Sequence, residues 1–305
     1  MKKVVIVWIL LSLIWGSTWI FIKLGLRELP PLTFAGLRFL VASFALAAIV
    51  LLRGVRLPRE PHQLFWLAGT GMISITINYG LVFWGETRIP SGLAAVLQAT
   101  IPVFGIVIAH YLLPTERLTW RKLAGIVTGF TGVGIIFFDQ IRIDGRAGLE
   151  GSLALLLSSF CIASGNVLIK SKLQRLDPAV IAAGQMLCGF PPLLLAGWWW
   201  EGNPLALRWT PLSIFSLFYL ALVGSAVAFL LYYWMVARIE VTKTMLISLV
   251  IPVVALIIGA VTVGEQITLS ILLGSLAILS GIAMILVNGR TRSYCQKGTK
   301  GRSRS

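Results

Sequence analysis

The sequence predicts an all-α integral membrane protein with ten transmembrane helices, arranged as two inverted five-helix repeats. Hydrophobic residues make up 57% of the 305 positions and charged residues only 12%, which is too apolar for a soluble fold. Apolar runs of roughly 20 residues, enough to cross ~30 Å of hydrocarbon, recur along the chain. A spaced pattern of proline, glutamate, threonine and glycine also occurs twice, in the two halves of the chain.

The expected spans follow one another with short connections, so no soluble domain fits between them. They cover residues 4–24, 32–52, 64–84, 92–113, 120–138, 149–169, 179–199, 212–236, 244–263 and 269–287. The first span is not expected to be a cleaved signal, because its apolar stretch is too long and no small-x-small cleavage motif follows it. Polar residues dilute the fourth and ninth spans most.

The internal repeat has nearly constant spacing. It reads Pro102-x13-Glu116-x2-Thr119-x5-Gly125-x6-Gly132 and then Pro252-x12-Glu265-x2-Thr268-x5-Gly274-x6-Gly281, while Trp84-x3-Arg88 recurs as Trp234-x3-Arg238. Five spans per repeat is an odd number, so the halves must enter the membrane in opposite directions, as alternating access requires. We expect repeats at 1–139 and 140–289, a seam in an outer loop at 139–150, and a basic, disordered cytoplasmic tail at 290–305. The repeated glycines are interpreted as helix-packing positions.

The positive charge is distributed unequally between the two sides of the predicted membrane. The net charge is +15. Nineteen Lys and Arg residues fall on the side that holds both termini and six on the other, with Arg38 inside the second span. The positive-inside rule therefore places both termini in the cytoplasm, and this distribution argues against nucleic-acid binding.

The order of these motifs resembles a known family. Trp15-Gly16-Ser17-x5-Lys23, then Pro30, Pro31 and Arg38, resembles the start of the drug/metabolite transporter superfamily in its EamA-type branch, and the Pro102–Gly132 and Pro252–Gly281 segments look like the ends of two EamA domains. The resemblance covers roughly residues 5 to 288. It implies a secondary transporter with ten helices and a central cavity that moves a metabolite, such as an amino acid, outward. Ser164-Gly165-Asn166 replaces the expected Trp-Gly-Ser in the second half, so the site is expected to be asymmetric.

Polar and aromatic residues at membrane depth are the candidates for substrate contact. Buried amides are costly in hydrocarbon and tend to face an interior, whereas deep aromatic rings can stack a planar substrate or bind an amine. The candidate substrate-binding residues are Trp15, Trp19, Lys23, Arg38, Asn78, Tyr79, Gln98, Asn166, Gln185 and Tyr232. Helix–helix hydrogen bonding, an interfacial aromatic belt and snorkelling of Lys23 are the alternative interpretations. Lys23 and Arg38 are the deepest cations and would meet a carboxylate.

The helix-breaking residues and the acids complete the pattern. Pro102 and Pro252 lie at matching points and are predicted to be paired kinks or hinges. Acidic residues fall only at span ends or in loops, Glu86 among them, so a proton relay through a midplane carboxylate is not expected. Coupling through substrate protonation, through Glu86 near an entrance, or no coupling at all remain open. Glu116 and Glu265 are predicted to be structural, with Thr119 and Thr268 as N-caps.

Three function classes are compared. An enzyme is not expected, because the interior lacks a nucleophile–base pair and a metal-ligand cluster, and a channel fits paired kinks less well than a carrier. We predict a secondary transporter that exports amino acids or related metabolites, with an uptake carrier, a facilitator or a channel as alternatives. No cofactor and no metal are expected. The predicted partners are a small-molecule substrate and the lipid bilayer, but no nucleic acid, with either a monomer or a homodimer as the assembly.

Overall fold

The computed structural model describes residues 2–55, 57–112, 119–143, 145–203, 207, 209–236 and 247–287. Every regular element in this part of the chain is a helix. In order they are α1 (Lys2–Gly25), α2 (Pro31–Leu52), α3 (Pro61–Gly71), η1 (Met72–Ile77), α4 (Asn78–Glu86), α5 (Ser91–Gln98), α6 (Ile101–Leu112), α7 (Trp120–Ile143), α8 (Gly145–Lys172), α9 (Pro178–Glu201), α10 (Pro211–Phe218), η3 (Tyr219–Val227), α11 (Ala228–Val236), α13 (Ile247–Val263) and α14 (Leu269–Val287). Eight helical segments are long and apolar enough to cross a membrane, and two shorter apolar ones cover Val250–Val263 and Leu269–Met284.

Local residue chemistry explains where several helices begin and end. Pro31 and Pro178 stand in the first turn of α2 and α9, where a missing N–H costs nothing. The Asp177 side chain accepts a hydrogen bond from the backbone N–H of Ala179 and so caps α9. Gly264 follows α13 with φ +69°, a left-handed conformation that favours glycine.

Two apolar segments contain a wider π-helical stretch. η1 lies between α3 and α4, and η3 lies between α10 and α11. Residues 72–77 and 222–227 match at the offset of 150 that relates Trp84 to Trp234. Such stretches are rare and concentrate at functional sites, because the extra residue in the turn displaces side chains from the regular helical face.

The repeated prolines behave differently from each other. α5 ends at Gln98 and α6 begins at Ile101, so the helix is interrupted just before Pro102. Pro252, in contrast, lies inside a continuous α13. The two prolines predicted to be paired kinks or hinges therefore stand in different settings, one just after a helix break and one within a helix.

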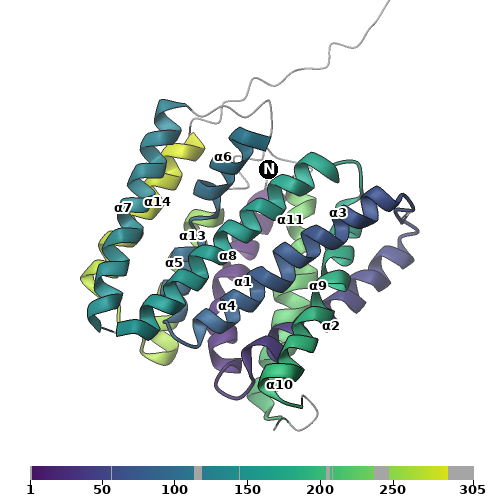
Figure 1. Ribbon diagram of the computed structural model, residues 1–305, viewed down its shortest axis with the longest axis horizontal. Helices are drawn as coiled ribbons and strands as arrows, with labels where there is room; N and C mark the ends of the chain where they lie inside the picture. The colour runs from purple at the N-terminus through teal and green to yellow at the C-terminus, as the bar shows by residue number, and fades with distance from the viewer. Residues whose placement is uncertain are drawn as a thin grey trace, which may run out of the picture.

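Helices from the two halves of the sequence pack against each other throughout. α7 runs along α14, and α2 along α9, in the two most extensive contacts (Figure 1). α1 packs on α13, and α8 on α4, α5 and α6. A core of mostly apolar buried side chains from both halves therefore connects the whole bundle.

Close contacts at the repeated glycines hold α7 against α14. A Cβ on Gly132 would lie 2.5 Å from the carbonyl oxygen of Gly274, and a Cβ on Gly281 would lie 2.5 Å from that of Gly125. The two copies of the glycine pattern thus meet each other, which confirms their interpretation as packing positions.

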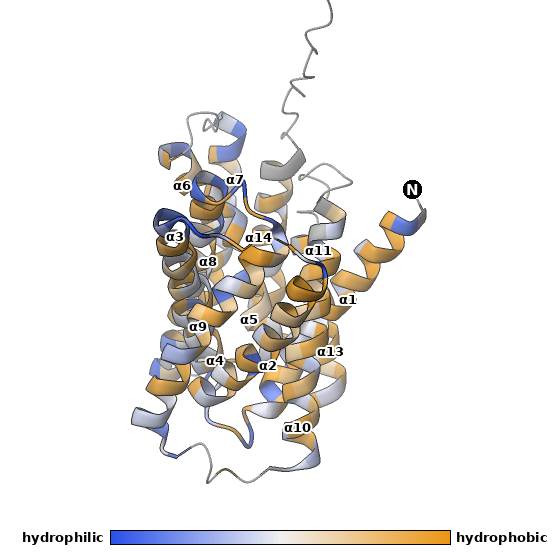
Figure 2. Ribbon diagram, turned by 90° about the vertical axis from the view of Figure 1, so that its right-hand side faces the viewer, coloured by the Kyte–Doolittle hydropathy of each residue, from blue (hydrophilic) through white to orange (hydrophobic). Residues whose placement is uncertain are grey.

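Many large apolar side chains are exposed along the helices. The ribbon coloured by hydropathy is mostly hydrophobic along the helices and more hydrophilic toward the ends of the bundle (Figure 2). The N-terminus lies at the same end of the bundle as the last described turns of α14 (Figure 1). The expected loop at 139–150 is wrong in its extent, because α7 continues to Ile143 and α8 already begins at Gly145. The predicted tail at 290–305, like Glu116, lies outside the described residues.

Substitution of Gly132 by alanine should destabilise the bundle by about 1–3 kcal/mol, because the added methyl group would push apart two backbones that already touch. Gly134 lies two residues away on the same helix, and a Cβ there would meet no other part of the described chain within 4 Å, so Gly134→Ala is the matched control. Thermal unfolding in detergent should show a lower Tm for Gly132→Ala only. Equal Tm values for the two variants would contradict the packing role.

Candidate functional site

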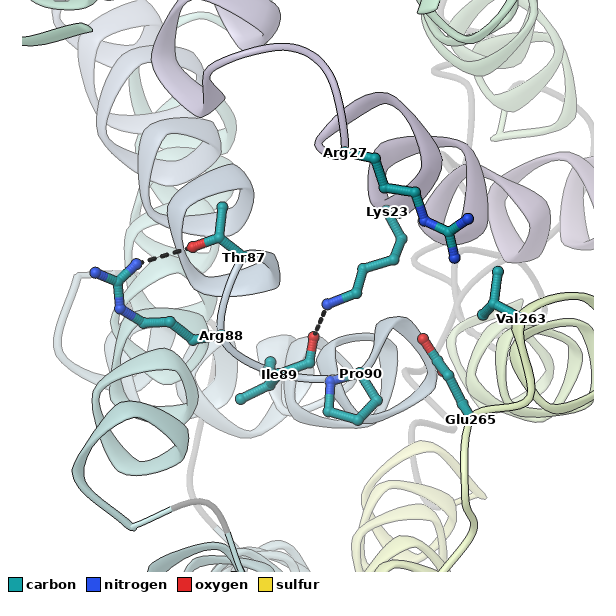
Figure 3. A pocket seen from close by; sticks show the side chains of 8 residues that line it. All are labelled: Lys23, Arg27, Thr87, Arg88, Ile89, Pro90, Val263 and Glu265. Atoms are coloured by element: carbon teal, nitrogen blue, oxygen red, sulfur yellow. Dashed lines mark hydrogen bonds between the residues drawn. The ribbon is translucent and has the colours of Figure 1, made fainter. Parts of the chain in front are cut away.

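The connection between α4 and α5 is held by Lys23 of α1. Its Nζ donates a hydrogen bond of 2.7 Å to the carbonyl oxygen of Glu86. It donates a second one of 2.8 Å to the carbonyl oxygen of Ile89 (Figure 3). Carbonyl groups at the end of a helix lack intrahelical hydrogen-bond partners and carry partial negative charge. A lysine at this position donates the missing hydrogen bonds and offsets the charge. Lys23 therefore binds backbone carbonyl groups in this structure.

The start of α5 is held by Glu265, which lies between α13 and α14. Its carboxylate accepts hydrogen bonds from the backbone N–H and the hydroxyl of Ser91, at 2.7 and 2.8 Å, and from the N–H of Gly92 at 3.0 Å. The residue before the helix is Pro90, whose side chain cannot cap it. Glu265 thus supplies the N-cap from the other half of the chain.

A second glutamate makes the same kind of contact at α2. Glu201, at the end of α9, accepts hydrogen bonds of 2.8 Å from the N–H groups of Leu32 and Thr33 and from the Thr33 hydroxyl. Pro30 precedes α2 and provides no side-chain cap. Both α2 and α5, each preceded by a proline, are therefore capped by carboxylates of the second half.

A cavity of about 260 Å³ opens beside the α4–α5 connection. Its lining residues are Lys23, Arg27, Thr87, Arg88, Ile89, Pro90, Val263 and Glu265 (Figure 3). Three of these side chains are cationic and one is acidic, so this entrance is predominantly positive.

Arg38 of α2 lies deeper in the bundle, where it faces α4 and η3. It is only 2% exposed, and its Nε donates a hydrogen bond to the hydroxyl of Ser225 at 3.1 Å. Its guanidinium carbon lies 5.0 Å from the centre of the Tyr79 ring and 5.9 Å from that of Phe83. Nη1 is buried and has no hydrogen-bond partner among the described residues. The site therefore presents a buried cation with an unused donor on an aromatic surface.

The predicted amides of the third and fourth spans form one network. Gln98 Nε2 donates to Asn78 Oδ1 at 3.3 Å, and Gln98 Oε1 accepts from the hydroxyls of Ser158, at 2.7 Å, and Ser159, at 3.1 Å. These residues belong to α4, α5 and α8, so the network also joins the two halves of the chain.

The predicted aromatic residues separate into different environments. Trp15 of α1 packs on Tyr232 of α11, with ring centres 5.4 Å apart. Trp19 is buried in the main core, and Tyr79 lies against Arg38 and Phe39. The aromatic candidates therefore do not form one continuous wall.

Two predicted amides lie apart from the Gln98 network. The Gln185 side chain is 6% exposed, and its Nε2 has no partner among the described residues. Asn166 is exposed. It follows Ser159 by seven residues, or about two turns, and so lies on the same face of α8. The structure thus brings Asn78 and Gln98 together but leaves Asn166 and Gln185 outside their hydrogen-bond network.

Sequence reasoning missed the burial of Glu86. This residue ends α4, where we expected an accessible entrance, yet its side chain is 0% exposed. Position at a span end was a misleading signal, because α8, α2 and α1 pack against α4. Of the expected caps, Thr268 accepts from the N–H of Ile271 and Thr119 from that of Lys122, which confirms both, while Glu265 caps a different helix from the one that follows it.

Comparison with protein families gives two matches to one model, described as the EamA-like transporter family, at residues 2–138 and 149–287. The chain belongs to the EamA-like transporter family. Because the members of this family and the named relatives are transporters, the protein is a membrane transporter and not an enzyme.

Several curated relatives span nearly the same length. The "Uncharacterized transporter YoaV" of Bacillus subtilis is 31% identical over 93% of this chain and 97% of its own. The "Uncharacterized inner membrane transporter YedA" of Escherichia coli is 31% identical over 85% and 82%. A "Probable amino-acid metabolite efflux pump" of Salmonella typhimurium is 28% identical over 93% and 95%. A solved crystal structure with 19% identity has a TM-score of 0.67, covering 94% of this chain and 97% of that one, and shows the fold alone.

Glu265→Gln should lower the free energy of unfolding by about 1 kcal/mol, because a neutral amide caps α5 less strongly than a carboxylate. Glu150→Gln is the control, since the Glu150 side chain is 37% exposed and its ion pairs, with Arg146 and at 3.8 Å with Arg88, are solvated contacts of little energetic value. Thermal unfolding in detergent should give a lower Tm for Glu265→Gln alone. A Tm for Glu265→Gln equal to that of the wild type would show that the cap contributes nothing.

Proposed function

We propose that the protein is a secondary transporter that exports amino acids or related metabolites across the cytoplasmic membrane by alternating access. The two family matches support a division into inverted repeats at 1–139 and 140–289, each with five membrane spans. The eight long and two shorter apolar segments supply ten candidate spans. Export of an amino acid is supported by the name of the Salmonella relative.

The observation that carries this proposal is the environment of Arg38. A guanidinium that is buried without an anionic partner is costly, and a substrate carboxylate would provide the missing charge and an acceptor for Nη1. The Tyr79 and Phe83 rings beside it would contact the rest of a zwitterionic or aromatic substrate.

The location of this cation between the halves also supports transport. Arg38 belongs to the first half and its partner Ser225 to the second, and the Gln98 network likewise joins α4 and α5 to α8. A relative motion of the halves would therefore break and remake these contacts, as an alternating-access site requires. Trp15, Trp19, Lys23, Asn166, Gln185 and Tyr232 remain proposed contributors, and Pro102 and Pro252 proposed hinges.

Substitution of Arg38 by lysine should reduce the efflux of amino acids from reconstituted vesicles by about tenfold, because an ammonium group cannot reproduce the planar guanidinium contact. Arg53→Lys, at the exposed end of the same helix, is the matched control and should transport normally. Protein abundance is measured in each vesicle preparation. Normal efflux by Arg38→Lys would contradict a role in substrate binding.

The same assay distinguishes the alternatives. Vesicles are loaded with labelled amino acids, nucleosides or amines, with and without a pH gradient. Saturable efflux that responds to the gradient supports a coupled exporter, whereas saturable flux without such a response indicates facilitated diffusion. Flux that does not saturate would favour a channel.

A reporter fused to the C-terminus should be active in the cytoplasm, because the positive-inside rule places the basic tail there. The N-terminus and the last described turns of α14 lie at the same end of the bundle, which agrees with an even number of membrane crossings (Figure 1). Paired alkaline phosphatase and green fluorescent protein fusions measure the orientation. Alkaline phosphatase activity in the C-terminal fusion would overturn the proposed topology.

A further inference from the structure

Glu86 is the most unusual charged residue of the described chain. Its side chain is 0% exposed, and neither carboxylate oxygen has a hydrogen-bond partner among the described residues. Lys23 lies close by, but its Nζ donates to the backbone carbonyls of Glu86 and Ile89. An ionised carboxylate in this place would lose its hydration without gaining hydrogen bonds in return.

The charged groups around Glu86 come from several helices. Those that act on it electrostatically are Lys23 of α1, Glu265 between α13 and α14, and Arg38 of α2. The two cations favour its ionised form and the second carboxylate opposes it, but none of them provides a hydrogen bond to its oxygens. α5 and η1 carry no charged residue, and Glu150 of α8 contacts Arg88 and Arg146.

We propose that Glu86 is a proton-binding site that couples transport to the proton gradient. In the closed arrangement seen here, the carboxyl group is neutral and carries a proton. The proton enters from the aqueous phase on one side, returns to the aqueous phase on the other, and no other group changes its chemistry. This inference rests on the proposed transport function. Of the kinds of coupling that the sequence left open, it selects the one through Glu86.

The hydrogen bonds of Lys23 and Glu265 explain how access of water to Glu86 would be controlled. Lys23 and Glu265 hold the two ends of the α4–α5 connection from α1 and from the second half. Separation of α1 and α13 from this connection would release both bonds and expose the Glu86 carboxyl to water through the neighbouring cavity. The connection could close again at low cost only after a proton has neutralised Glu86.

The Glu86→Gln variant tests this site, because glutamine resembles a protonated glutamate in shape but cannot release a proton. One coupled proton would allow about a tenfold change in substrate accumulation per unit of pH gradient. Glu86→Gln should lose this response while retaining substrate exchange at equal pH. Glu150→Gln, with a solvated carboxylate near the same connection, should keep both. A pH-gradient response that persists in Glu86→Gln overturns the proposal, and so does loss of exchange by a folded variant, which would assign Glu86 to an ammonium group of the substrate.

Infrared spectroscopy tests protonation without any transport assay. The purified wild-type protein in lipid nanodiscs should show, at neutral pH, the carbonyl absorption of a protonated carboxylic acid that is missing from Glu86→Gln. Identical spectra of the two proteins would show that Glu86 is ionised and would overturn the proposal. Because this measurement needs no substrate, it decides the proton site even if no flux is found, which would instead count against the proposed function.

Discussion

The need to satisfy backbone groups where helices stop near a membrane interior governs this structure. An uncapped helix end exposes N–H or C=O groups, which are costly away from water. α4 ends and α5 begins at a short turn beside the cavity, where Lys23 binds the carbonyls and Glu265 binds the N–H groups. Since Pro90 provides no cap, the fold of the first half depends on a carboxylate of the second.

Side chains of the second half bind the first half at several other places. Glu201 caps α2, Ser225 binds Arg38, and the serines of α8 bind Gln98. The glycine contacts between α7 and α14 are different, because backbone touches backbone and any sliding meets steric resistance. The polar contacts can therefore exchange partners during a conformational change, while the glycine contact favours α7 and α14 moving as one pair.

Glu86 links the closure of helices around the α4–α5 connection to the charge of its own carboxyl group. It is buried where α8, α2 and α1 pack on α4, next to the connection whose two ends Lys23 and Glu265 bind. A carboxyl group in that position is tolerated best when neutral, so closure and protonation favour each other. Arg38 is the opposite case, because its guanidinium stays charged and can be compensated only by an anion or by aromatic rings.

The sequence by itself determined the helical membrane fold, the repeated pattern and the family, because apolar length and residue spacing are properties of the chain alone. It also singled out Asn78, Gln98 and Arg38 as candidate site residues, since polar groups within apolar runs are conspicuous. Only the tertiary structure decided that Glu86 is buried, that Glu265 caps α5 and that Asn166 is exposed. Position along a span does not reveal which neighbouring helix covers a side chain, and that depends on contacts between residues far apart in the sequence.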